Sequence, residues 1–213
     1  MLQRGKLLEL YDRLYSTYGP QQWWPAETPF EVMVGAVLTQ NTAWTNVEKA
    51  ISNLKKADKL DVIPMTRMSE RRLAELIRPA GYFNVKARRL KAMCRWLKNG
   101  GGMAGWGSLS TDDLRAALLS VHGIGPETAD DILLYAFDRP VFVIDAYTRR
   151  LLLAMDLISG GEDYEQLRMA FESVLEPEVA LFNEYHALIV RHAKERCANT
   201  LECRHCMVQR PLL

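Results

Sequence analysis

Among the residues whose types and spacing could support binding or catalysis is a glycine turn suited to holding a phosphate. Residues 118–130 read Leu-Leu-Ser-Val-His-Gly-Ile-Gly-Pro-Glu-Thr-Ala-Asp, a pattern typical of a helix, a tight turn and a second helix. Gly123 and Gly125 permit positive φ and the close approach of a ligand, and Pro126 suits the first position of a helix. The N–H groups of such a turn and helix start together fit one phosphate. An ordinary helix–helix corner is the alternative.

A cluster of cysteines points to metal chemistry. Three of the four cysteines, Cys197, Cys203 and Cys206, lie within ten residues of one another, whereas a disulfide framework would spread them along the chain. In a reducing compartment such clustering favours metal ligands. The sequence shows no signal-peptide pattern at its start, so we expect a cytoplasmic protein of a bacterium or archaeon.

One aspartate follows an apolar run at the start of a helix-compatible segment. Residues 141–144 are Val-Phe-Val-Ile, and Asp145 comes directly after them, twenty residues beyond Gly125. An aspartate at a helix start satisfies the backbone N–H groups of that helix. Capping without catalysis is therefore the simplest role of Asp145 taken alone.

Helices must position these residues, because helical periodicity dominates the sequence. Glycine and proline separate the periodic segments, and Gly100-Gly101-Gly102 stops one of them. The sequence predicts helices over residues 7–15, 30–38, 45–56, 69–77, 85–99, 111–119 and 126–136, and one beginning after Asp145. The strand-like run 141–144 is too short to build a sheet, so the predicted class is all-α.

Composition limits the class of protein further. Hydrophobic residues make up 48% and charged residues 25% of 213 residues, as in soluble globular proteins, and no run is long enough to span a membrane. The 27 basic and 26 acidic residues nearly cancel, so an anionic partner needs a local patch. The segment 86–98 is basic along one helix and is either a solvated face or a phosphate-contacting surface. Cys94 and Trp96 in it are expected to pack.

Four ordered motifs resemble the helix-hairpin-helix DNA glycosylases of the endonuclease III superfamily, over nearly the whole chain. They are Leu-Thr-Gln-Asn-Thr at 38–42, Gly-Tyr-Phe-Asn-Val-Lys-Ala at 81–87, the glycine turn and the cysteine tail. The segments 22–26 and 123–130 look most like the endonuclease III-related branch that contains bacterial 3-methyladenine glycosylases. This HhH-GPD resemblance implies two helical lobes with a DNA-binding cleft between them.

The resemblance assigns the lobes and the catalytic group. A six-helix lobe would span 29–139 and contain the hairpin, and residues 1–28 with 140–213 would form the other lobe with the cysteine loop. Asp145 would face a base rotated out of the duplex. It would stabilise the oxocarbenium charge and orient or deprotonate the attacking water. In bifunctional members a lysine stands where this chain has Glu127, so the Schiff-base step loses its nucleophile.

The resemblance also implies which residues contact substrate. The pocket would be lined by aromatic and neighbouring residues, namely Trp23, Trp24, Pro25, Trp44 and Glu127. A cationic alkylated purine would gain from stacking on an indole. The DNA backbone and the gap left by the flipped base would be contacted by Gln40, Tyr82, Asn84, Lys86, His122, Gly123 and Gly125. Core packing, helix capping and dipole compensation are the alternatives for individual members of these sets.

The cysteine tail departs from the family's [4Fe-4S] loop. Its spacing is Cys-x5-Cys-x2-Cys against the family's Cys-x6-Cys-x2-Cys-x5-Cys, and the fourth cysteine is absent. Three alternatives follow: a [4Fe-4S] cluster with a non-cysteine ligand, a zinc site completed by His192 or His205, or a loop without metal. The resemblance favours the cluster.

The sequence therefore predicts a monomeric, monofunctional DNA glycosylase of base excision repair. Its partner would be double-stranded DNA containing a damaged base, with an alkylated purine such as 3-methyladenine the favoured target. A glycosylase for a mismatched or oxidised base, with weak lyase activity, is one alternative. A helix-hairpin-helix protein that binds DNA without catalysis is another.

Overall fold

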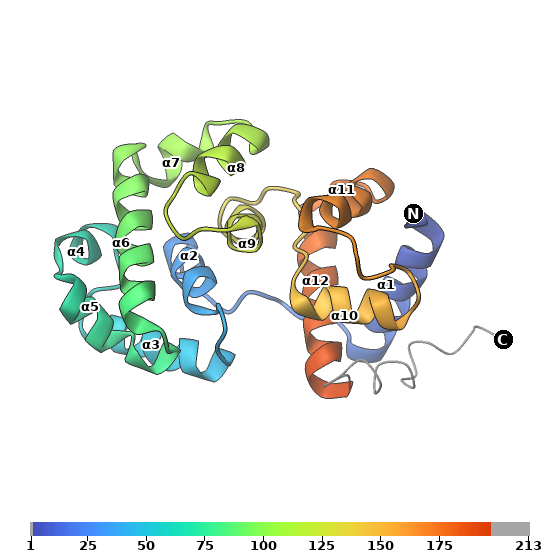
Figure 1. The fold of residues 1–213 in the computed structure, drawn as a ribbon, viewed down its shortest axis with the longest axis horizontal. Coiled ribbons are helices and arrows are strands. Elements are labelled where there is room, and N and C mark those ends of the chain that lie inside the picture. The colour runs from blue at the N-terminus through green and yellow to red at the C-terminus, as the bar shows by residue number, and fades with distance from the viewer. Residues whose placement is uncertain (1, 197–213) are drawn as a thin grey trace. The chain divides into compact units, whose positions relative to one another are not determined.

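The protein is described here by a computed structural model that covers residues 2–196 (Figure 1). Within this range there are helices and connecting segments but no β-strand, which confirms the predicted all-α class. The run 141–144 is buried and has no regular secondary structure, as expected for a segment too short to form a sheet. None of the helices in residues 2–196 has the length and apolar character to span a membrane.

The chain divides into two compact units. The terminal unit combines the N-terminal residues through Pro25 with those from Pro140 onward, and the central unit is Ala26–Arg139. The chain thus leaves the terminal unit once and returns to it after the central unit is complete.

The central unit contains the hairpin and eight α-helices. These are α2 Pro29–Leu38, α3 Trp44–Lys56, α4 Val62–Arg67, α5 Glu70–Leu76, α6 Phe83–Asn99, α7 Gly102–Gly107, α8 Thr111–Leu119 and α9 Pro126–Ala136, with a 3-10 turn at Arg78–Ala80. The expected number of six is wrong, although all six predicted helices are present. The additional helices, α4 and α7, have six residues each and are too short to show a periodic pattern.

Helix α2 forms the centre of this unit. Every residue from Phe30 to Leu38 is buried, and α2 packs against α9, α3 and α6. Thr28 caps its start by accepting a hydrogen bond from the Glu31 N–H at 3.1 Å. Because α2 is enclosed by its neighbours, its C-terminal carbonyls need partners inside the protein.

Two buried lysines of α6 donate hydrogen bonds to backbone carbonyls at the ends of neighbouring helices. The Lys86 side chain is 2% exposed, and its Nζ donates to the carbonyls of Leu38 at 2.9 Å and Ala80 at 2.7 Å. Lys91 donates in the same way to carbonyls at the end of α4. Burial and the nearby Arg89 lower the pKa of Lys86 to about 8, so the amine is protonated at neutral pH. The expected DNA contact of Lys86 is wrong, because its donors are used inside the unit.

The terminal unit is built around an aromatic core. Its helices are α1 Arg4–Tyr18, α10 Ala146–Ala154, α11 Tyr164–Val174 and α12 Val179–Arg196, and α12 packs against both α1 and α10. Phe142 stacks on Phe171 at 4.1 Å and meets Phe182 edge-on. The Tyr185 hydroxyl donates to the Leu7 carbonyl at 2.7 Å. The buried run that precedes Asp145 is thereby fixed in this core.

We expect Lys86→Met to destabilise the protein by about 2 kcal/mol or more, because the carbonyls of Leu38 and Ala80 lose their charged donor. The measurement is urea unfolding at neutral pH, with Lys49→Met as the control, since Lys49 is exposed on α3. Equal midpoints for the two variants would contradict the assigned role of Lys86.

Candidate active site

Asp145 lies where the buried run meets α10. It is the N-cap residue of α10, and its Oδ1 accepts a hydrogen bond from the Thr148 N–H at 2.7 Å. Its Oδ2 lies 3.6 Å from Nε2 of His186, a residue of α12. The expected capping role of Asp145 is therefore present, and a second group faces its other oxygen.

The Asp145 carboxyl is ionised at neutral pH. Burial would by itself raise its pKa, but the imidazole of His186 and the amide of Thr148 outweigh burial and hold the pKa below its ordinary value. Its side chain keeps 14% exposure. A carboxylate of this kind can stabilise positive charge that develops on a bound molecule.

The hairpin joins α8 to α9. Its turn is closed by a hydrogen bond from the Ile124 N–H to the Val121 carbonyl at 3.0 Å. Gly123 has φ +86° and so uses the positive φ that glycine permits, whereas Gly125 has φ −95° and does not use it. Only one residue of the turn needs the left-handed region, because Gly125 already serves as the extended N-cap of α9. His122 and Gly125 are exposed.

A buried ion pair holds the two helices of the hairpin together. Arg115 of α8 donates two hydrogen bonds to the Asp130 carboxylate of α9, at 2.7 Å and 3.1 Å. A bidentate pair of this kind fixes orientation as well as distance. Sequence reasoning did not identify this pair, although Asp130 stood within the recognised motif.

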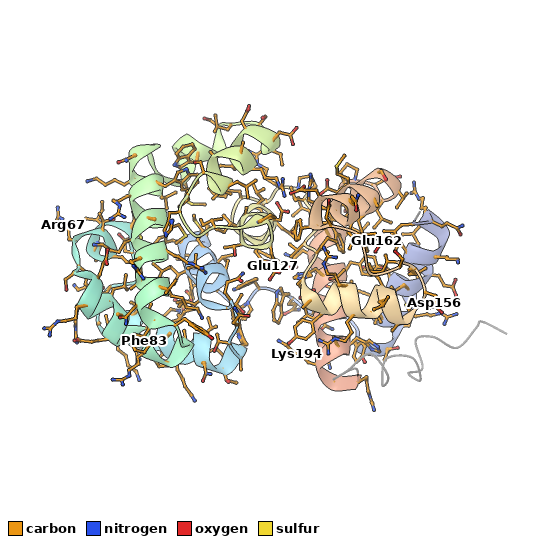
Figure 2. The ribbon with its side chains drawn as sticks, viewed as in Figure 1. Arg67, Phe83, Glu127, Asp156, Glu162 and Lys194 are labelled. Atoms are coloured by element: carbon orange, nitrogen blue, oxygen red, sulfur yellow. The ribbon has the colours of Figure 1, made fainter. Side chains whose placement is uncertain are left out.

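Gln40 is attached to the first helical turn after the hairpin. Its Nε2 donates to Thr128 Oγ1 at 2.8 Å, so it does not cap the end of α2. Glu127, beside Thr128, lies in the first turn of α9 and is partly exposed (Figure 2). The structure therefore brings Gln40, Glu127 and the hairpin together within the central unit.

Tyr82 is the most exposed large hydrophobic side chain among residues 2–196, at 71%. It has φ +43° at the N-cap of α6, and Asn84 beside it is also exposed. Ordinary packing is thus the wrong interpretation of Tyr82. By contrast, Cys94 and Trp96 pack as expected: burial raises the pKa of the Cys94 thiol to about 12, and Trp96 stacks on Trp106 at 4.2 Å.

The candidate pocket residues belong to both units. Trp23, Trp24 and Pro25 are in the terminal unit, where the two indoles meet edge-on at 6.0 Å. Trp44 opens α3 of the central unit, and all three tryptophans are partly exposed. The ammonium of Lys194, on α12 (Figure 2), lies 5.6 Å from the centre of the Trp23 ring.

The segment that carries Trp23 is held against α12 by contacts that sequence reasoning missed. The Gln21 N–H donates to Glu184 at 2.7 Å, and Arg191 donates to the Gln21 side chain at 3.2 Å. The Tyr18 hydroxyl lies 2.9 Å from His192 Nδ1. Local sequence patterns do not predict these contacts, because each contact joins segments that are far apart in the sequence.

The cysteine tail lies outside the described residues, so Cys197, Cys203, Cys206 and His205 have no structural description here. His192 is described. Its ring is buried and its Nδ1 contacts the Tyr18 hydroxyl. Burial, followed by the charge of Arg196, lowers its pKa.

The sequence matches a known family. Residues 34–177 match the model of HhH-GPD superfamily base excision DNA repair proteins. A protein of Methanocaldococcus jannaschii, itself only provisionally named as a DNA repair glycosylase, is 45% identical over 206 residues, which cover 95% of this chain and 94% of that protein. The chain belongs to the HhH-GPD superfamily of base excision DNA repair proteins.

Known structures agree with this membership. The crystal structure of H. pylori 3-methyladenine DNA glycosylase bound to 1,N6-ethenoadenine is 31% identical, with a TM-score of 0.76, over 92% of this chain and 98% of that one. A non-covalent endonuclease III–DNA complex has a TM-score of 0.81 at 18% identity, over 98% of this chain and 94% of that one. Endonuclease III of Escherichia coli strain K12 is 24% identical over 98% of this chain and 95% of its own. The predicted superfamily, branch and endonuclease III-like fold are confirmed. The protein is a DNA glycosylase of base excision repair.

The two hairpin glycines should respond differently to alanine. Gly123→Ala should lower stability by about 1 kcal/mol or more, because φ is positive there and the new Cβ would stand 2.4 Å from Arg89 Cγ. Gly125→Ala should change stability by less than about 0.5 kcal/mol, because its φ is ordinary and nothing lies within 4 Å of the new Cβ. Thermal unfolding of both variants is the measurement, and an equal loss would contradict this difference.

Proposed function

We propose that the protein removes an alkylated purine, with 3-methyladenine the favoured base, by hydrolysis of its N-glycosidic bond. The observation that carries this proposal is the ionised carboxylate of Asp145 in a chain whose hairpin has Glu127 in place of a lysine. Similarity to the H. pylori 3-methyladenine glycosylase supports the choice of base.

In the proposed reaction the bond between the base and the sugar C1′ breaks and leaves positive charge on the sugar. Asp145 stabilises that charge without forming a covalent bond. Water then attacks C1′, its oxygen becomes the sugar hydroxyl, and its proton leaves to a base or to solvent. The products are a free base and an intact abasic strand.

Indole stacking would select the base. A cationic alkylated purine is attracted to an indole face by about 1 to 2 kcal/mol when water is excluded. Lys194 already lies against Trp23, and a second cation on that ring would be repelled by it. Among the three candidate tryptophans, Trp24 and Trp44 are therefore better suited to a cationic base.

The DNA backbone would be held by the hairpin and by Arg89 of α6. The methylenes of Arg89 lie over Gly123, as the contact expected for a Cβ at that position shows. Arg89 forms no ion pair with any of residues 2–196, and the buried cation Lys86 is its neighbour. A guanidinium over the hairpin without an acidic partner favours a phosphate at this point. Tyr82 and Gln40 would enter the gap left by the flipped base.

For the cysteine tail we propose a [4Fe-4S] cluster held by Cys197, Cys203, Cys206 and one further ligand that is not cysteine. His192 is a poor candidate for a zinc site, because its ring is buried and its Nδ1 is engaged by the Tyr18 hydroxyl. The cluster would stabilise the fold of the tail, and no step of base removal is assigned to it.

Asp145→Asn should reduce base release by about 100-fold or more in single-turnover assays, because the charge that stabilises the sugar is lost. Asparagine also caps helices well, so α10 and duplex binding should persist. The substrates are duplexes with methylated purines, ethenoadenine, mismatched thymine, uracil or oxidised guanine. If the wild type released a different base, that base would replace the alkylated purine as the proposed substrate. If it bound the duplexes but released no base, the protein would be a DNA-binding protein without glycosylase activity.

Borohydride should trap no covalent protein–DNA adduct, and the abasic strand should break only in hot alkali, because Glu127 cannot form an imine. Lys86 cannot substitute, since both its bonds are to carbonyls inside the central unit. An adduct that disappears in Lys49→Ala, a variant of an exposed lysine of α3, would show that another amine performs lyase chemistry.

Protein purified without oxygen should be brown and contain about four iron atoms per chain, as expected for a cubane cluster. Absorption spectra and metal analysis are the measurements. Stoichiometric zinc in a colourless protein would favour a zinc site, and absence of both metals would favour a loop without metal.

A further inference from the structure

His186 is a buried histidine to which the proposed reaction gives no role. It lies in the middle of α12 and is 5% exposed. Its Nε2 lies 3.6 Å from Asp145 Oδ2, although the two residues are far apart in the sequence. The packing of α12 against α10 is what brings them together.

The two oxygens of Asp145 are thus faced by groups from two different helices. Oδ1 is held by the Thr148 N–H of its own helix at 2.7 Å. That single bond leaves the carboxylate free to turn about its axis. At 3.6 Å the His186 Nε2 is just outside hydrogen-bond range of Oδ2, and a closer approach of a few tenths of an ångström on substrate binding would fix the plane of the carboxylate. Such fixing matters because transition-state groups must be held to fractions of an ångström.

We propose that His186 is a positioning residue for base removal: its Nε2–H directs the Asp145 carboxylate. This inference rests on the proposed catalytic role of Asp145. A neutral imidazole with its proton on Nε2 and an imidazolium both present this donor. The imidazole makes no contact with the DNA in this role and acts through Asp145.

The arrangement also bears on what Asp145 does. A carboxylate that is stabilised in its ionised form is a weak proton acceptor and a strong electrostatic stabiliser. His186 therefore favours stabilisation of the sugar's positive charge over deprotonation of water by Asp145. The lowered pKa of Asp145 agrees with this division.

The test uses His186→Phe, which keeps a ring of similar size and removes the donor, and His186→Gln, which restores an N–H donor. We expect His186→Phe to lower the single-turnover rate at saturating protein by about tenfold or more, with the Kd for lesion DNA changed by less than about twofold. His186→Gln should recover most of the rate. A Phe variant as fast as the wild type would overturn the inference, as would a loss confined to Kd.

A double-mutant cycle separates positioning from a general loss of structure. If His186 acts through Asp145, then His186→Phe should lower the rate no further in the Asp145→Asn background. An equal loss in both backgrounds would overturn the inference. If the Asp145→Asn single variant keeps the wild-type rate, the proposed function fails. If Asp145→Asn is slow but His186→Phe keeps the wild-type rate, the proposed function stands and the proposed role of His186 fails.

Stability is measured on every variant, with His192→Phe showing what loss of another buried imidazole from α12 does to thermal unfolding. Should His186→Phe fail to fold, His186→Asn takes its place, because its shorter amide does not reach Asp145 Oδ2. The same single-turnover rates and the same double-mutant cycle are then measured for His186→Asn. A loss of rate seen with Asp145 but not in the Asp145→Asn background supports the inference, and an equal loss in both backgrounds overturns it.

Discussion

A charged carboxylate next to a hydrophobic core is the constraint on which the terminal unit depends. Burying an ionised group is unfavourable by several kcal/mol unless hydrogen bonds or opposite charge offset it. Here the start of α10 supplies an N–H to one oxygen of Asp145, and α12 brings His186 to the other. Both depend on the run 141–144, which Phe142 anchors by stacking on Phe171. The aromatic core therefore sets the position of Asp145.

The central unit solves the same problem with the opposite charge. The Lys86 ammonium is buried because it binds the carbonyls of Leu38 and Ala80. Each carbonyl lies two residues before a candidate DNA-gap residue, Gln40 in one case and Tyr82 in the other. One buried cation thus fixes both loops. Lysine in the recognised motif has a structural explanation in these bonds, and its influence on DNA would be exerted through the loops it holds.

How far the sequence could predict this structure depends on the range of the interactions. Periodicity found the long helices and the hairpin because those signals are local, and Gly123 followed from the turn it occupies. The burial of Lys86 had a local signal too: Lys86, Leu90 and Leu97 share the inward face of α6. No local sequence signal predicted the position of His186, because the residues near it in the sequence do not indicate that α12 packs on α10. The Gly-x-Gly pattern left open which of the two glycines has positive φ, because it does not specify the turn type.

Glu127, which stands where bifunctional members of the family have a lysine, and the contacts around Asp145 both favour hydrolysis without a covalent intermediate. In the proposed reaction the hairpin offers no amine, so no covalent intermediate relieves the positive charge on the sugar, and that charge is stabilised electrostatically until water adds. Such stabilisation is strongest from a carboxylate that is already oriented and ionised, because no reorganisation is then needed when the base leaves. The two partners of Asp145 provide both conditions. Under the proposed function, a chain without the covalent route has more need of a fixed carboxylate than one with it, and the contacts from α10 and α12 meet that need.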